Sequence, residues 1–154
     1  MKHYNLSPII KGGGIFVKYQ CKVEINASRD KVITLYQDIT WQKELGLLKK
    51  EMIKGKSFET GSVAHLYFPV NGKEIIMKET VEDNNLPESI TIIYEVDGHW
   101  NRCVSKFIEK NGKVIYLMDV EFRFSEELDI PKIKFMNQTQ QEMEYFKEFV
   151  ENNL

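Results

Sequence analysis

Glu79 is the residue whose type and position most favour chemistry. In the segment 73–82, Ile75, Met77 and Val81 alternate with mostly polar residues, and Glu79 falls on their apolar side. A carboxylate on an apolar face is costly unless a partner neutralises it. Such a group can act as an acid or base, or it can orient a ligand. In the alternative interpretation, a Lys, Arg or Tyr near a sheet edge pairs with it and its role is structural.

The other reactive side chains form no recognised catalytic pattern. The sequence has no Gly-x-Ser-x-Gly motif, no Cys and His at a family-specific spacing and no paired carboxylates. His65 and His99 stand alone, so we predict no metal and no cofactor. An enzyme acting on an enolisable substrate needs one acid or base, and Glu79 with Tyr94 or His99 is the available set.

A second polar set follows from alternation along the expected strand 99–109. Asn101, Cys103 and Ser105 share one face of this strand, and Lys106 lies on the other. Because the Lys106 face is the more easily hydrated, we expect the three small polar residues to point inward.

These side chains require a sheet to position them. Residues 15–25 alternate as a long strand, and two short helices are expected between residues 28 and 48. Asn-Gly pairs at 71–72 and 111–112 are strong hairpin signals. The expected strands are 15–25, 49–59, 62–70, 73–82, 90–96, 99–109 and 114–124. The order predicts an α+β domain with about seven antiparallel strands and no second domain.

Residues 131–154 are expected to form one long amphipathic helix. Its apolar residues, among them Met136 and Met143, recur at helical spacing, but Thr139 and Gln140 interrupt the middle of that face. An antiparallel sheet with one apolar face needs a cover, and this helix is the main candidate. The polar middle permits two interpretations, a helix that roofs a cavity or a helix packed on an ordinary core.

Length and charge narrow the function classes. A chain of 154 residues suits one domain, and a net charge of −2 argues against nucleic acid as a partner. We interpret the basic run that contains Lys50 and Lys54 as a solvated edge strand, because Glu51 and Glu59 lie within it. No stretch approaches the ~20 apolar residues that span a bilayer. We predict a cytoplasmic monomer or homodimer with free cysteines.

Residues 1–14 lack clear periodicity, and we expect them to be a leader outside the domain at 15–154. One hypothesis is a start-site artefact, because Lys11 and the three glycines after it have purine-rich codons, like a bacterial ribosome-binding site. Val17 would then be read from a GTG start. The mass of the native protein tests this, and a mass that begins at Met1 contradicts it.

Several short motifs resemble the START-like, or SRPBCC, superfamily, which has the helix-grip fold. The resemblance covers residues 15–154. The segments that carry it are 23–28 (VEINAS), 30–32 (DKV), 38–41 (DITW), 79–82 (ETVE), 86–90 (LPESI) and 104–107 (VSKF). Many members have a second Trp shortly after the first. None stands at 43–45 here, which leaves the subfamily open.

The resemblance implies a mostly apolar cavity between the curved sheet and the C-terminal helix. The expected lining residues are Glu79, Met77, Tyr94, Asn101, Cys103, Ser105, Met118, Met136, Gln140 and Met143. The leading hypothesis is a binding or carrier protein for a small hydrophobic ligand such as a lipid, an isoprenoid or a polyketide-like aromatic. One alternative is a polyketide cyclase/dehydratase-like enzyme with Glu79 as its candidate catalytic residue. The other is an interaction module similar to the chaperone activators, with a collapsed pocket.

Overall fold

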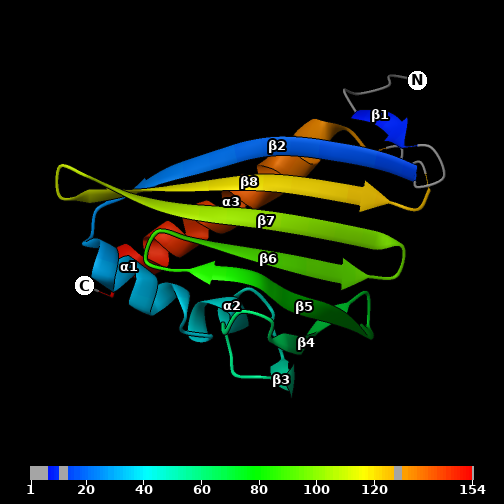
Figure 1. Ribbon diagram of the computed structural model, residues 1–154, viewed down its shortest axis with the longest axis horizontal. Coiled ribbons are helices and arrows are strands. Elements are labelled where there is room, and N and C mark those ends of the chain that lie inside the picture. The colour runs from blue at the N-terminus through cyan, green and yellow to red at the C-terminus, as the bar shows by residue number, and fades with distance from the viewer. Residues whose placement is uncertain (1–6, 11–13, 127–129, 154) are drawn as a thin grey trace.

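One curved antiparallel sheet and one long helix dominate the molecule (Figure 1). The computed structural model describes residues 7–10, 14–126 and 130–153. Within these ranges the strands are β1 (Ser7–Ile10), β2 (Gly14–Ile25), β3 (Lys49–Lys54), β4 (Val63–Val70), β5 (Lys73–Asn85), β6 (Ser89–Val96), β7 (His99–Lys110) and β8 (Lys113–Phe124). The helices are α1 (Arg29–Tyr36), α2 (Thr40–Glu44) and α3 (Lys132–Glu151). The order across the sheet is β1-β2-β8-β7-β6-β5-β4-β3.

The predicted architecture is confirmed: β2 to β8, two short helices and a long final helix follow in the expected order. The sequence did not predict β1, which pairs with β2 and places Ser7 opposite Phe16. The rest of the expected leader, and Leu154 at the expected end of the last helix, lie outside the described residues. The last helix ends at Glu151, and Asn152 is its C-cap.

Two strand ends differ from the prediction. β3 stops at Lys54, because Gly55 turns the chain with a φ of 73°. β5 continues to Asn85 instead of ending before a turn, because an irregularity between Val81 and Asp83 keeps it paired with β6. The two Asn-Gly hairpins form as predicted, with positive φ at both residues of each pair.

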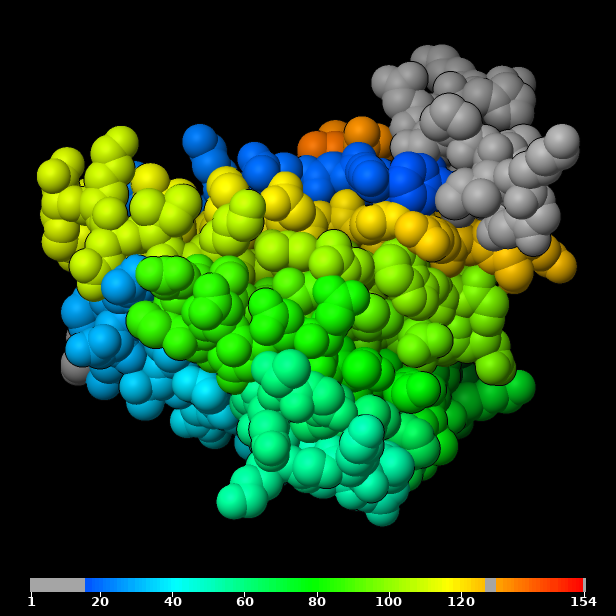
Figure 2. Space-filling model, viewed as in Figure 1, coloured from blue at the N-terminus to red at the C-terminus, as the bar shows by residue number. Residues whose placement is uncertain are grey.

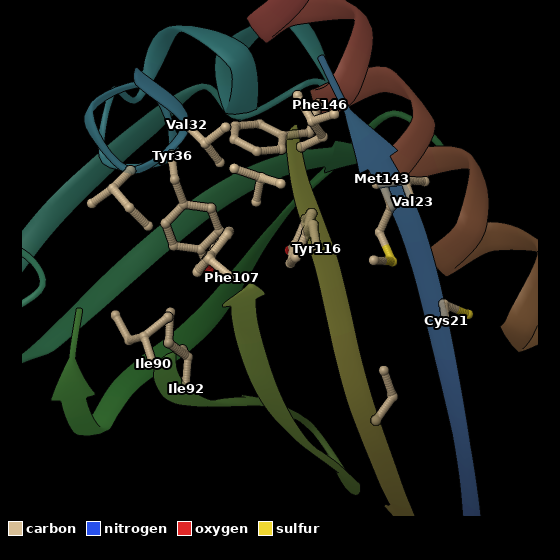
Figure 3. Packing of buried hydrophobic residues seen from close by; sticks show 14 of the residues in the cluster. Cys21, Val23, Val32, Tyr36, Ile90, Ile92, Phe107, Tyr116, Met143 and Phe146 are labelled. Atoms are coloured by element: carbon tan, nitrogen blue, oxygen red, sulfur yellow. The ribbon is translucent and has the colours of Figure 1, made fainter. Parts of the chain in front are cut away.

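The concave side of the sheet holds the core, and α3 crosses it behind β2 and β8 in the view of Figure 1. Figure 2 shows the opposite, convex side, where the outer side chains of the strands form a continuous surface. At one end of the concave side, α1 contributes Val32 and Tyr36, and α3 contributes Phe146 (Figure 3). Ser28 caps α1 by accepting a hydrogen bond from the Lys31 N–H.

An ionic contact holds the last turn of α3 to the end of β2. The Glu151 carboxylate accepts the backbone N–H of Asn26 at 2.8 Å and the Lys147 ammonium at 2.8 Å. The Asn26 N–H and then Lys147 lower the pKa of Glu151, because both interactions favour the charged carboxylate. The lowered pKa means that this stabilisation is present at neutral pH and is lost as the pH falls through the pKa of the folded state.

We expect Glu151→Gln to lower the free energy of unfolding at pH 7 by no more than about 1 kcal/mol, because the contact is partly solvated. The difference from the wild type should shrink as the solution is acidified. Urea unfolding at several pH values measures it. Glu148→Gln, on the same helix and exposed, is the control and should show no such dependence. A pH-independent deficit would contradict the ionic assignment.

Candidate functional site

The two halves of α3 meet the sheet differently. In its C-terminal half Met143, Phe146 and Val150 are buried, whereas no described residue of the first half is. Phe135 and Met136 in that first half are only half-buried although they pack against the core. The helix is therefore sealed onto the sheet at one end and covers the interior loosely at the other.

An aromatic cluster forms the sealed end. The Tyr36 ring lies 5.2 Å from Phe107 and 5.8 Å from Phe146, and the Phe107 and Tyr116 rings stack at 4.9 Å, measured between centroids (Figure 3). The Ser105 hydroxyl lies 3.5 Å from the Tyr116 hydroxyl inside this cluster. Burial raises the pKa of the Tyr36 and Tyr116 hydroxyls, so both stay neutral. Ser105 and Met143 belong to this dry region.

Polar contacts tie the looser half of α3 to β2. The Tyr19 hydroxyl lies 2.7 Å from the Thr139 hydroxyl and donates to the Phe135 carbonyl at 3.2 Å. The Gln140 amide donates to the Lys22 carbonyl at 3.0 Å. These contacts explain the polar middle of the helix, because its polar residues face β2 and its backbone. They fix this half of the helix along β2.

The strand register brings several of the predicted residues into one row across the sheet. Glu79 pairs with Tyr94, Tyr94 with Asn101, and Asn101 with Phe122. Cys103 lies on the same concave side, two residues further along β7. Except for Glu79, these residues are half-buried, so each keeps accessible surface. Their inward orientation agrees with the alternation of the sequence.

The other predicted site residues lie around this row. Met118 pairs with Ser105 and is half-buried, as is Met136 on α3, and both contact the core. Met77 is half-buried opposite Leu66 on β4. Gln140 is the residue that the structure keeps apart, because its amide is engaged with β2 and with the Glu144 carboxylate.

Glu79 forms a buried ion pair with Lys50. The Lys50 ammonium lies 3.1 Å from Glu79 Oε1, and only 7% and 2% of the two side chains are exposed. The ammonium also donates to the Ser57 hydroxyl at 2.7 Å and lies 4.1 Å from the centre of the Phe58 ring. Glu79 Oε2 is buried and has no hydrogen-bond donor among the described residues. The pair matches the structural interpretation of Glu79 and leaves one acceptor atom unused.

The burial of Lys50 corrects the interpretation of the basic run as wholly solvated. β3 is an edge strand as expected, but Lys50 turns inward from it. Alternation places Lys50 on the same face as half-buried Met52, and this signal was present in the sequence. The other charged residues of the run favoured the interpretation that the whole strand is solvated.

Glu142 on α3 is a second acidic group that sequence reasoning missed. It lies one turn from both Thr139 and Phe146, on the face of the helix that meets the interior. The residue is exposed, and desolvation raises the pKa of its carboxyl group although the Gln138 side chain opposes this shift. Burial raises the pKa of the Cys103 thiol to about 12, and the Glu142 charge adds to this shift. Glu142 therefore acts electrostatically on the concave face.

Metal chemistry and membrane insertion receive no support from the described part of the chain. Within residues 7–10, 14–126 and 130–153 no three or more His, Cys, Asp or Glu side chains gather as metal ligands. None of the helices in these ranges is both long enough and apolar enough to cross a bilayer.

Comparison with solved structures identifies the fold. The chain has the helix-grip fold that START-like proteins share. Ara h 8.0201 matches with a TM-score of 0.74 at 9% identity, over 89% of this chain and 99% of that one. A START superfamily protein from Mycobacterium smegmatis matches at 0.66 and 14% identity, over 89% and 99%. The ZhuI aromatase/cyclase from Streptomyces sp. R1128 matches at 0.68 and 10% identity, over 88% and 94%.

These likenesses establish the fold and leave the function to the residues of the site. No protein-family model and no curated protein matches the sequence.

The ion pair gives a stability prediction. Lys50→Met or Glu79→Leu alone leaves one buried group without its partner and should lower the free energy of unfolding by about 3–5 kcal/mol. The double variant removes both groups and should recover most of that loss. Denaturant unfolding of the four proteins measures the coupling. The exposed pair of Arg102 and Glu82, 2.7 Å apart on the convex side, is the control, with an expected cost of about 1 kcal/mol or less. Additive losses at Lys50 and Glu79 would contradict the pairing.

Proposed function

We propose that this protein binds a small hydrophobic ligand between the concave face of the sheet and the first half of α3, as a binding or carrier protein. The observation that carries the proposal is the contrast between the two ends of the interior. At the sealed end the side chains are buried. At the other end Val17, Tyr19 and Phe124 are buried as well, but Tyr94, Asn101, Cys103 and Phe122 beside them keep accessible surface although they point toward the helix. A hydrophobic ligand would cover that surface.

The side chains around this region suit an apolar guest. Met118 and Phe122 come from β8, and Phe135 and Met136 from α3, all half-buried. Methionine side chains adapt to guests of different shape, and aromatic rings offer large contact areas. Burying the apolar surface of the guest supplies affinity at roughly 25 cal/mol per Å² before the costs of association. The fold supports this reading, since ligand sites of this kind are concave and mostly apolar.

Binding is favoured over catalysis by the state of Glu79. A cyclase-like enzyme needs a carboxylate that is free to exchange a proton with its substrate. In the structure Glu79 is instead held in an ion pair with Lys50. The likeness to an aromatase/cyclase supports a related shape for the interior. The interaction-module alternative needs a collapsed interior, which the half-buried row across β5 to β8 does not favour.

The direct test is native mass spectrometry of protein purified from its own host, followed by organic extraction. We expect an apolar molecule bound in stoichiometric amount. An empty protein that also shows no thermal shift with a panel of lipids and polyketide-like aromatics would contradict the proposal. Turnover of the extracted molecule by the protein would instead support the alternative of a cyclase/dehydratase-like enzyme.

A pair of variants on β7 locates the site. Cys103→Phe adds a ring to the concave side and should reduce binding of the extracted ligand by about tenfold or more, because overfilling a site costs energy. Val104→Phe adds the same ring to the convex side, one residue away, and is the matched control. Isothermal titration measures both affinities, and circular dichroism checks the fold. Equal affinities for the two folded variants would place the ligand elsewhere.

A further inference from the structure

Two carboxylates, one from each side of the interior, point to the chemistry of the ligand. We propose that the protein selects an apolar ligand that carries a hydrogen-bond donor and no negative charge, an alcohol, phenol or amine rather than a carboxylate. Glu79 on β5 and Glu142 on α3 are the groups that select it. This inference rests on the proposed function, because it assumes a ligand between the sheet and α3.

On the sheet side, the unused acceptor of Glu79 favours a donor. Its Oε2 atom has no hydrogen-bond partner among the described residues, and the side chain is 2% exposed. A buried acceptor without a donor is costly, and a donor that reaches it recovers the cost. The neighbour across the register is Tyr94, which is half-buried. A hydroxyl or ammonium group placed beside Tyr94 is suited to this oxygen, whereas a carboxylate is repelled by it.

On the helix side, Glu142 gives the interior a second negative charge. Thr139 and Phe146, the residues one turn before and after it, both contact concave-face residues, Tyr19 and Tyr116 respectively. Glu142 thus stands at the border of the face that α3 turns to the sheet, at the first residue of the C-terminal half of the helix. Because the residue keeps exposed surface, a ligand can approach it without displacing the helix.

The buried ammonium group of Lys50 is already paired. Among the strand residues that the structure describes, Lys50 is the only Lys or Arg buried on the concave side. Its ammonium contacts Glu79, Ser57 and Phe58. An anionic ligand would therefore lose its hydration without gaining a free positive partner, and burial of an unpaired charge is strongly unfavourable. A neutral or cationic ligand with a hydrogen-bond donor does not bring an unpaired negative charge into the interior.

Four naphthalene probes that differ in one substituent test the inference: 2-naphthalenemethanol, 2-naphthalenemethylamine, 2-naphthoate and 2-methylnaphthalene. Isothermal titration at pH 7 and low salt should show the alcohol and the amine binding at least about tenfold tighter than the carboxylate. Comparing the alcohol with 2-methylnaphthalene measures the effect of a hydrogen-bond donor alone. Comparing the amine with the alcohol adds the effect of a positive charge. An equal or tighter affinity for 2-naphthoate would overturn the inference and leave the proposed function standing.

Two variants assign the selection to its residues. Glu142→Gln should reduce the gap in affinity between the amine and 2-naphthoate, expressed as the ratio of the two affinities, by about threefold or more, because one nearby negative charge is removed. The matched control Glu148→Gln, exposed on the same helix, should leave the gap unchanged. The double variant Lys50→Met/Glu79→Leu removes the acceptor without leaving a lone buried charge, and should weaken the alcohol relative to 2-methylnaphthalene.

The outcomes separate the two proposals. Unchanged gaps in all folded variants would overturn the roles of Glu79 and Glu142. Failure of every probe, 2-methylnaphthalene included, to bind the folded wild type would count against the proposed function itself.

Discussion

The packing of Phe146 against Tyr36 and Tyr116 is the contact on which the rest of the structure depends. It joins α1, the sheet and α3 at one end of the concave face, and all three rings are buried there. Truncating a buried Phe typically costs about 3–5 kcal/mol, a large share of the stability of a domain this size. Because this end is closed by rings, α3 has a fixed anchor. The other half of the helix does not have to be apolar to stay in place.

That freedom explains the composition of the first half of α3. Thr139 and Gln140 make directed hydrogen bonds to β2, which position the helix without filling the interior. A helix held only by apolar packing would have to lie closer to the sheet to bury its apolar surface. Here the hydrogen bonds along one edge replace part of that packing. The concave row from Tyr94 to Phe122 thus keeps its accessible surface, and this row is where a guest molecule would lie.

A residue on an edge strand of the sheet places a positive charge in the interior. Lys50 reaches inward from β3 and neutralises Glu79 on β5, with β4 between them. A buried ion pair of this kind contributes little net stability compared with apolar residues, but each member needs the other. It also leaves one carboxylate oxygen without a donor. Glu142 adds a negative charge at the border of α3, whereas the Glu79–Lys50 pair is neutral overall and contributes one unpaired acceptor, and these two groups set the proposed selectivity of the interior.

The sequence by itself determined the order of strands and helices, the hairpins at the Asn-Gly pairs and the inward faces of β5 and β7, because these depend on local periodicity and turn conformation. It did not reveal that Lys50 on β3 points inward. Alternation alone placed Glu79, Tyr94, Asn101 and Cys103 on the concave side. Only the tertiary structure decided which of them meet. The partner of Glu79 is Lys50, 29 positions earlier in the chain, and the pairing depends on the register of β3, β4 and β5. Likewise, Gln140 bonds to β2 while Glu142 stays exposed on α3. The anchor at Phe146 set the rotation of α3, and periodicity within one helix does not fix that angle.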